Sequence, residues 1–300
     1  MPNNRLLRMA YLFTLLTVGQ LAAADEDRDR GVIFYERFLG STNTLGNVFR
    51  LDTTVGYSFN KHLSVDGGLP LFFVRPSGTA TALGGIADTN GIGNAYLELR
   101  FAAPNPTINY ACALTGAAPT GDKSRGLSTG RVTVDWTNRF DRSFSQLTPF
   151  GAIGFANTVS DTPLFVRPYT TLGFITHLEG GALYRVTRFL DIGAGAYAIE
   201  PAGQQTIVSE LVTKSSATPA GSGKNGGRGG KQGAFETTPV SVGSADLVRD
   251  NGFSLWGSAH LSKALTLQAG YTRSVHYALN TVTFGIGVNL GSVVKSMTSY

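Results

Sequence analysis

The sequence predicts an all-β fold, a single antiparallel transmembrane β-barrel of about twelve strands. Three observations indicate this fold. Apolar and polar residues alternate along segments such as 47–59, a cleavable secretory signal opens the chain, and short connections alternate with longer ones between the expected strands. Alternation with a period of two is typical of strands that separate an apolar from a polar environment.

Segment 47–59 reads NVFRLDTTVGYSF and carries the clearest alternation. Its odd positions from Phe49 to Phe59 are apolar, aromatic or methyl-bearing, whereas its even positions include Arg50 and Asp52. Successive side chains of a β-strand point to opposite faces, so one face of this strand is apolar and the other is polar. We therefore expect the apolar face to meet lipid and the polar face to line an interior.

The N-terminus predicts export. Arg5 and Arg8 precede the apolar run 9–18, and three alanines at 22–24 lead into acidic residues. This order of features is that of a secretory signal peptide, here 1–24, cleaved before Asp25. A single anchoring helix is the alternative, but the run has about half of the ~20 residues that span a bilayer. No later apolar run reaches that length, so we expect any membrane crossing to use strands.

Composition is consistent with this fold and argues against other classes. Charged residues make up 15% of the chain, below the ~25% of soluble domains, and 38 of the 300 residues are glycine. The net charge of +5 falls to +3 when Arg5 and Arg8 are removed with the signal, which is too weak to indicate nucleic-acid binding. The single cysteine, Cys112, excludes an internal disulfide.

The remaining residues 25–300 form one expected domain, the barrel. Strands are predicted at 31–39, 47–60, 62–75, 92–103, 107–119, 129–141, 147–158, 167–186, 188–200, 251–262, 264–276 and 280–290. Short connections are expected at 60–62, 104–106, 141–146, 187–189 and 262–263, and longer ones near 40–46, 76–91, 119–128, 157–166 and 201–250, with a smaller one near Ala278. Twelve strands put all short connections and both termini on one side, as in bacterial outer-membrane barrels with short periplasmic turns and longer outer loops.

Segment 201–250 differs from the rest of the chain. Its middle, 214–233, is rich in glycine and serine and cannot bury enough apolar surface to offset its ordering entropy. We expect a disordered outer loop. A sharper alternative is contact with anionic lipopolysaccharide through four cations, because clustered cations attract anionic surfaces. These are Lys214, Lys224, Arg228 and Lys231.

Charged residues fall on the polar register, which we expect to face the lumen. The candidate lumen-lining residues are Arg50, Asp52, Asp66, Glu98, Arg100, Arg131, Asp135, Arg139, Glu179 and Arg185. Because both signs interleave, these charges are expected either to brace the wall in pairs or to confer weak ion selectivity. Twelve strands lie between small filled barrels and the sixteen-stranded porins, so the lumen is expected to be narrow.

Aromatic residues gather near the expected short-turn end of the strands. They are Tyr57, Phe59, Phe101, Phe140 and Tyr184. An aromatic girdle at one membrane interface accounts for this position. The general preference of aromatic residues for strands is the other explanation.

Four short motifs resemble a known family of outer-membrane proteins, described as MetA-pathway phenol-degradation transporters. They are GLPL at 68–71, GIGN at 91–94, APTGD at 118–122 and FGIGVNL at 284–290. The chain departs from the family at Asn94, where the family has aspartate, and in the insert 201–250. The resemblance implies a barrel that passes small, often aromatic, molecules across the outer membrane, without implying phenol as the solute.

We therefore expect a non-enzymatic channel of the bacterial outer membrane for passive passage of small solutes, hydrophobic or aromatic ones among them. One alternative is a non-conducting surface barrel for adhesion or lipopolysaccharide contact. Another is a lipid hydrolase, because His260 and Ser262 have the spacing of a catalytic pair, although Ser262 falls at a short turn. The four histidines are not clustered in the sequence, so no metal or other cofactor is expected.

Overall fold

The computed structural model describes residues 31–43, 46–76, 89–159, 167, 169–209, 240–262 and 265–289. The predicted signal peptide, 1–24, lies outside them. None of the helices in the described part of the chain is long and apolar enough to span a bilayer. The strands are β1 (Gly31–Asn43), β2 (Gly46–Asn60), β3 (Leu63–Pro76), β4 (Thr89–Ile92), β5 (Tyr96–Ala103), β6 (Asn109–Ala117), β7 (Thr133–Asp141), β8 (Leu147–Ala156), β9 (Tyr169–Leu172), β10 (Ile175–Arg185), β11 (Leu190–Pro201), β12 (Gln205–Ser209), β13 (Val240–Gly243), β14 (Asp250–His260), β15 (Leu265–Ser274) and β16 (Leu279–Asn289).

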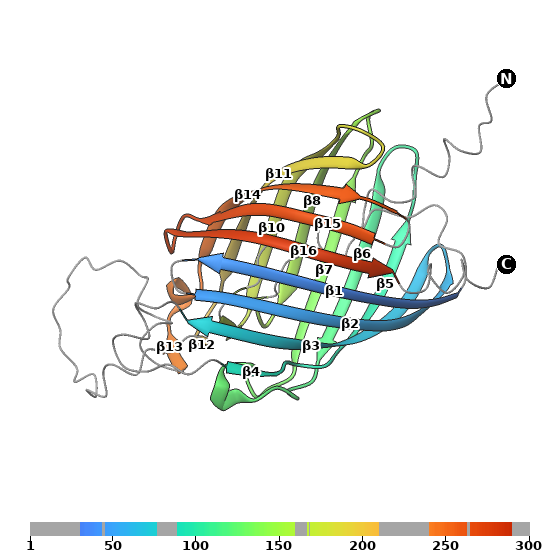
Figure 1. The fold of residues 1–300 in the computed structure, drawn as a ribbon. Coiled ribbons are helices and arrows are strands. Elements are labelled where there is room, and N and C mark those ends of the chain that lie inside the picture. Colours follow the sequence, from blue (N-terminus) through green and yellow to red (C-terminus); the bar gives the residue numbers. More distant parts are fainter. Residues whose placement is uncertain are drawn as a thin grey trace, which may run out of the picture.

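Antiparallel pairing closes the sheet into a barrel (Figure 1). The strand order is β2-β1-β16-β15-β14-β11-β10-β8-β7-β6-β5-β3, and β2 pairs with β3 to complete the ring. β4 and β5 both pair with β3, at 71–74 and 63–68 respectively. Together they occupy the place of one interrupted strand in the ring. The barrel therefore has twelve strands, as the sequence predicted.

One end of the barrel carries only short connections, whereas the opposite end carries all the long ones together with the short β1–β2 and β15–β16 connections. Short ones join β2 to β3, β5 to β6, β7 to β8, β10 to β11 and β14 to β15 at one end, which we call the short-turn end. The first residue of β1 and the last of β16 lie at this end too, because Gly31 pairs with Ser58 and Asn289 with Tyr35. We call the opposite end, where β12 and β13 lie at the left of Figure 1, the long-loop end.

One predicted long connection is wrong. The sequence placed a longer loop at 40–46, but β1 continues to Asn43, which pairs with Gly46 at the start of β2. Only two residues remain between these strands. Gly40 reads as a strand breaker, yet it lies within β1 beside the ring of Phe284, and the alternation continues past it with Ser41 fully buried.

Side chains of the barrel alternate between an apolar outer face and a mainly polar inner face. On β2, Val55 is 55% exposed, while its neighbour Thr54 is 6% exposed. The outward positions form a belt that includes Leu69, Leu97, Leu99, Phe101, Leu114, Val134, Trp136, Phe140, Phe155, Leu178, Ile192, Leu255, Leu267, Val282, Phe284 and Ile286. Glu36 interrupts this belt: its carboxylate accepts a 2.9 Å hydrogen bond from the hydroxyl of outward-facing Thr53.

The aromatic residues predicted near the short-turn end lie on the outer face. Phe59, Phe101, Phe140 and Tyr184 are each more than 40% exposed. Their rings contact further aromatic neighbours: Tyr57 and Phe59 lie 5.3 Å apart between ring centres, and Tyr110 joins this set 5.2 Å from Phe140. Exposed aromatic residues of the outer face therefore gather at the short-turn end, where the sequence predicts either an interfacial girdle or strand-favouring aromatic residues.

The long loops contain more regular structure than the sequence predicted. The predicted strand 167–186 is two strands, β9 and β10, which separate at 173–174. Segment 201–250, predicted to be one disordered loop, contributes β12, β13 and the 3-10 helix η3 (Ala245–Leu247) at its two flanks. β9, β12 and β13 pair into a small three-stranded sheet. The part 210–239 lies outside the described residues.

If the outer belt faces lipid, a charged side chain introduced there should destabilise the barrel more near the middle of a strand than near its end. Leu255 lies in the middle of β14 and faces outward, whereas Asn251 faces outward at the long-loop end of the same strand. Leu255→Arg should lower the free energy of unfolding by about 2–4 kcal/mol, and Asn251→Arg by at most about 1 kcal/mol. Denaturant titration of the protein folded into lipid vesicles measures both, and equal small losses would contradict a lipid-facing belt.

Candidate functional site

The inner wall of the barrel carries the candidate site residues. On β2, Arg50 and Asp52 face inward and form an ion pair of 2.6 Å. The phenol oxygen of Tyr96 on β5 lies 2.9 Å from the hydroxyl of Thr54 and donates to Asp52 at 3.3 Å. This cluster ties β2 to β5, across β3, through side chains.

A second ion-pair cluster lies on β3, β5 and β6. The guanidinium of Arg100 pairs with Glu98 and lies 3.7 Å from the carboxylate of Asp66. Glu98 also accepts a 2.8 Å hydrogen bond from the hydroxyl of Thr115. Asp66 and Glu98 are each 2% exposed, so both carboxylates are held within a buried, paired network.

β7 and β10 contribute a third set. Asp135 accepts a 2.7 Å hydrogen bond from Thr137, and His177 on β10 lies 3.2 Å from the same carboxylate oxygen. Further along β7, Arg139 lies 3.7 Å from Asp141 and its guanidinium stacks on a phenyl ring. Glu179 interacts electrostatically with Arg139 across β8.

Near the short-turn end, Arg185 and Asp191 approach each other at 3.9 Å. The ring of His260 lies 3.1 Å from Asp191 and 3.3 Å from the hydroxyl of Thr266. His260 therefore faces inward in a polar cluster. Ser262 lies beyond β14 in the short turn, where its hydroxyl accepts a hydrogen bond from the backbone N–H of Leu265.

One predicted lining residue lies outside the barrel wall. The sequence placed Arg131 in a strand 129–141, but β7 begins at Thr133. Thr129 accepts a hydrogen bond from the backbone N–H of Arg131 and donates one to its carbonyl, which holds this segment in a turn. Arg131 is exposed at the long-loop end. The cations Lys214, Lys224, Arg228 and Lys231 lie outside the described residues.

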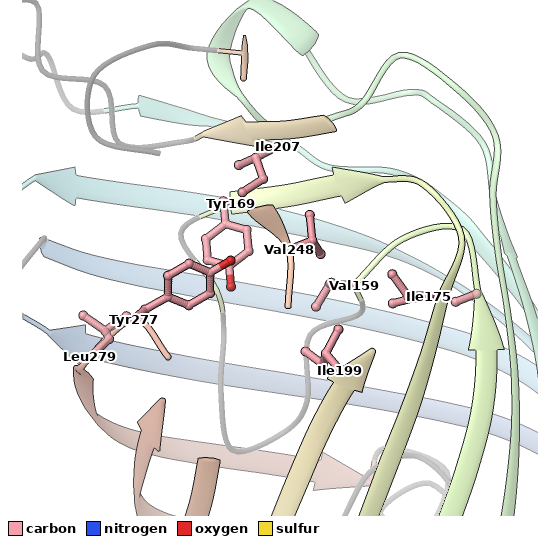
Figure 2. Close-up of a cluster of buried hydrophobic side chains, with 9 residues drawn as sticks. Val159, Tyr169, Ile175, Ile199, Ile207, Val248, Tyr277 and Leu279 are labelled. Atoms are coloured by element: carbon pink, nitrogen blue, oxygen red, sulfur yellow. The ribbon is translucent and has the colours of Figure 1, made fainter. Parts of the chain in front are cut away.

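Loops fold inward over the wall at the long-loop end and build an apolar mouth cluster (Figure 2). Inward residues of the strands, among them Ile175, Ile199 and Leu279, pack against residues carried by loops and the small sheet. The cluster consists of Ala156, Val159, Tyr169, Ile175, Ile199, Ile207, Val248, Tyr277 and Leu279. It brings apolar side chains together at the long-loop end of the barrel.

Tyr277 fixes the centre of the mouth cluster. It is 2% exposed, its ring lies 6.0 Å from that of Tyr169, and its hydroxyl donates a 2.7 Å hydrogen bond to the carbonyl of Leu247. Burial raises the pKa of the Tyr277 phenol above its ordinary value. The hydroxyl therefore stays protonated and keeps donating this hydrogen bond at physiological pH.

A second apolar cluster narrows the same end from the opposite wall. Leu127, in the loop between β6 and β7, packs against inward-facing Leu39, Val48, Phe72 and Val74. This loop also contains η1 (Lys123–Arg125), which Asp122 caps by accepting from the backbone N–H of Ser124. Hydrogen bonds from Ser124 lower the pKa of the exposed Asp122 carboxyl.

Three of the four motifs that carry the family resemblance, 68–71, 91–94 and 118–122, meet in space. The N–H of Gly93 donates to the carbonyl of Pro70 at 2.8 Å, and the hydroxyl of Thr120 donates to the carbonyl of Gly93 at 2.9 Å. The side-chain oxygen of Asn94 accepts from the N–H of Gly121 at 3.3 Å. Three separate stretches thus secure the break between β4 and β5, and Asn94 serves here as a structural hydrogen-bond acceptor.

Three buried residues of the inner wall were missed by sequence reasoning. Phe150, Leu183 and Trp256 form an apolar cluster on the inner face of β8, β10 and β14. Phe150 lies in a segment without a clear register. The inward position of Trp256 could have been recognised in the sequence, since this residue lies on the inward register between Ser254 and Ser258.

Within the described residues, no group of three or more histidine, cysteine or acidic side chains could hold a metal ion.

Comparisons with known proteins support the architecture. No family model and no curated protein matches the chain. The COG4313 outer membrane channel from Pseudomonas putida F1 is similar in structure, with a TM-score of 0.53 and 15% identity over 86% of this chain and 94% of that one. The KdgM porin in complex with disordered oligogalacturonate follows, with 0.48 and 7% over 85% and 98%, and the NanC porin, with 0.44 and 9% over the same shares. The first similarity shows the fold alone, a closed antiparallel β-barrel, and agrees with the strand pairing of this chain.

Removing only the cation from the ion-pair cluster around Arg100 should greatly lower the free energy of unfolding. Arg100→Met leaves Glu98 and Asp66 buried without their cation and should cost about 3–5 kcal/mol of unfolding free energy. Adding Glu98→Gln should restore part of this loss. Arg125→Met, which removes an exposed ion pair with Asp122, should cost less than about 1 kcal/mol. Unfolding in lipid vesicles measures all three, and a similar small cost for both arginines would contradict a bracing role.

Proposed function

We propose that this barrel is a passive channel for small solutes, hydrophobic or aromatic ones among them, and that it performs no catalytic step. The carrying observation is the pair of apolar clusters that line the long-loop end from opposite walls. A solute that enters there meets apolar side chains before it reaches the polar interior. Such an entrance favours apolar or amphiphilic solutes over strongly hydrated ions.

The paired charges support a small-solute channel with weak charge selectivity. Asp52, Asp66, Glu98 and Arg139 are each 2% exposed, and ion pairs or hydrogen bonds hold all four. Rings of one sign give ion selectivity, whereas interleaved pairs largely cancel their field. We therefore assign the inward charges of β2, β3, β5 and β7 to bracing the wall of a narrow lumen. The strand count agrees with this size.

The positions of His260 and Ser262 argue against the lipid hydrolase alternative and so favour a channel. A hydrolytic pair needs the histidine beside the serine and oriented toward it. The ring nitrogens of His260 are engaged by Asp191 and Thr266 on the inner face, while the hydroxyl of Ser262 caps the short turn. We also propose that the chain is a member of the phenol-degradation transporter family, on its four short motifs and on the contacts that join three of them at Pro70, Gly93 and Gly121.

Planar-bilayer recording tests the channel. Protein whose folding is verified by heat-modifiable gel mobility should give small, discrete conductance steps. Folded protein that gives no openings and no solute entry into liposomes would contradict the proposal and favour a non-conducting surface barrel.

The mouth cluster predicts which side chain restricts entry. Tyr277→Ala should enlarge the entrance and raise the unit conductance, at a cost of about 3–5 kcal/mol for the truncated buried ring. Tyr271→Ala is the matched control, because Tyr271 faces outward on β15 and bonds to Asn280. Its conductance should equal that of the unmodified protein. An unchanged conductance in Tyr277→Ala would show that the mouth cluster does not restrict passage.

A further inference from the structure

The outer face of the barrel carries an arginine at its long-loop edge. Arg273 is the penultimate residue of β15 and lies between Thr272 and Ser274, which face inward and are each 1% exposed. Alternation along the strand therefore turns the Arg273 side chain outward, where it is partly exposed. Its cross-strand neighbours, Phe253 on β14 and Asn280 on β16, face outward and are exposed too. A cation thus lies at the edge of the apolar outer belt.

Asn280 fixes the position of this guanidinium. Its side-chain oxygen accepts a 2.5 Å hydrogen bond from Nη1 of Arg273 and a 2.7 Å hydrogen bond from the hydroxyl of Tyr271. These two bonds occupy the oxygen, so the amide group of Asn280 is left to donate. An arginine carries five N–H donors and no acceptor, so its remaining N–H groups also require an acceptor. We call Tyr271, Arg273 and Asn280 the outer arginine cluster.

The charge of the outer arginine cluster is not balanced by a neighbour. Within the part of the chain that the structure describes, no carboxylate forms an ion pair with Arg273. Arg249 is exposed at the same end of the barrel, and it pairs with Glu200 at 3.1 Å and with Asp246 at 2.9 Å. Of these two arginines, only Arg249 is neutralised by its surroundings. The outer arginine cluster therefore favours an anionic ligand that accepts hydrogen bonds.

The cluster lies at the level where a lipid headgroup would meet the barrel. In bacterial outer-membrane barrels the longer loops lie on the extracellular side, so the long-loop end reaches the outer leaflet, whose lipopolysaccharide carries phosphate groups. Toward the middle of the wall formed by β14, β15 and β16 (Figure 1), the outward residues Leu255, Val282 and Phe284 are exposed and apolar. The rings of Phe253 and Tyr271 lie 6.3 Å apart beside the cluster, as is typical of aromatic residues at a membrane interface. A lipid phosphate with its acyl chains therefore fits both the cluster and the apolar wall.

We propose that the outer arginine cluster binds a phosphate group of an outer-leaflet lipid, whose acyl chains lie along the apolar wall of β14, β15 and β16. The planar guanidinium matches phosphate oxygens with two parallel N–H groups, and such charge-assisted hydrogen bonds are stronger than neutral ones. Asn280 holds the guanidinium in place and adds its own amide donors. This site lies on the outer wall, so it does not depend on passage of solutes through the lumen. It is distinct from any lipopolysaccharide contact through the cations of 214–233.

Native mass spectrometry of the detergent-folded full chain tests the site, with bisphosphorylated lipid A as the probe. Lipid A should bind saturably, and lipid A from which both phosphates have been removed should bind more weakly. Arg273→Gln should weaken binding of the bisphosphorylated form by about fivefold, as expected for one cation at a membrane surface. Arg188→Gln is the matched control, because it changes the net charge equally but lies in the short turn at the opposite end, where Arg188 lies over the Phe189 ring. It should leave the affinity unchanged.

A second variant tests the charge while it keeps the arginine. Asn280→Asp places a carboxylate beside Arg273, which reproduces the pairing that Glu200 provides for Arg249. Because the guanidinium is then neutralised, the affinity for bisphosphorylated lipid A should fall at least as far as in Arg273→Gln. Heat-modifiable gel mobility verifies that each variant is folded before it is measured.

Three results would overturn the inference. Equal weakening by Arg273→Gln and Arg188→Gln would show attraction to the overall charge of the protein. Equally tight binding of dephosphorylated lipid A would show contact with the acyl chains alone. Displacement of lipid A by an equal concentration of inorganic phosphate would assign the cluster to a soluble anion. The bilayer recordings of the proposed channel stand apart from these measurements, because a barrel that does not conduct would still present the same outer wall to lipid.

Discussion

Closure of the sheet is the constraint on which the other features of this protein depend. Hydrocarbon offers no hydrogen-bond partners, so every backbone N–H and C=O group within it must pair inside the protein. Twelve strands meet this requirement only because β2 pairs with both β1 and β3, which leaves the ring without a free edge. The broken strand of β4 and β5 is the point where this ring is irregular, and hydrogen bonds from Gly93, Thr120 and Gly121 secure it.

Closure also divides the side chains into two environments. Outward side chains contact lipid in place of water. Large apolar residues such as Trp136 and Leu255 can therefore be exposed on the outer face without loss of stability. Inward charges have the opposite problem, because their side chains are almost fully buried and a buried charge is costly unless it is paired. Pairing solves it for Asp52, Glu98 and Asp141, each of which has a cation or a hydrogen-bond donor within reach. The charged wall of β2, β3, β5 and β7 is therefore a structural feature first.

The two ends of the barrel have different chemistry. At the short-turn end, tight connections leave polar clusters such as His260 and Asp191 at the inner face. At the long-loop end, the loop between β6 and β7 brings Leu127 against the inner wall, and the short turn between β15 and β16 carries Tyr277 into the mouth cluster. The ion pair of Arg139 with Asp141 and the buried ring of Trp256 lie between these ends on the inner wall. A solute that crosses the barrel would thus meet the apolar clusters of the long-loop end before the paired charges of the wall.

The amino-acid sequence by itself determined the barrel and the strand count, because a period of two is a local property of the chain. The sequence also indicated which end of the barrel carries the long loops, through the lengths of the connections. The sequence misjudged 40–46, where Gly40 resembled a break, and Arg131, where a turn held by Thr129 delays β7. Only the tertiary structure decided which side chains meet across strands distant in sequence: Arg139 with Phe150, Phe150 with Trp256, and Tyr277 with Leu247. Such contacts depend on the stagger between strands and on the inward path of the loops, which no single segment encodes.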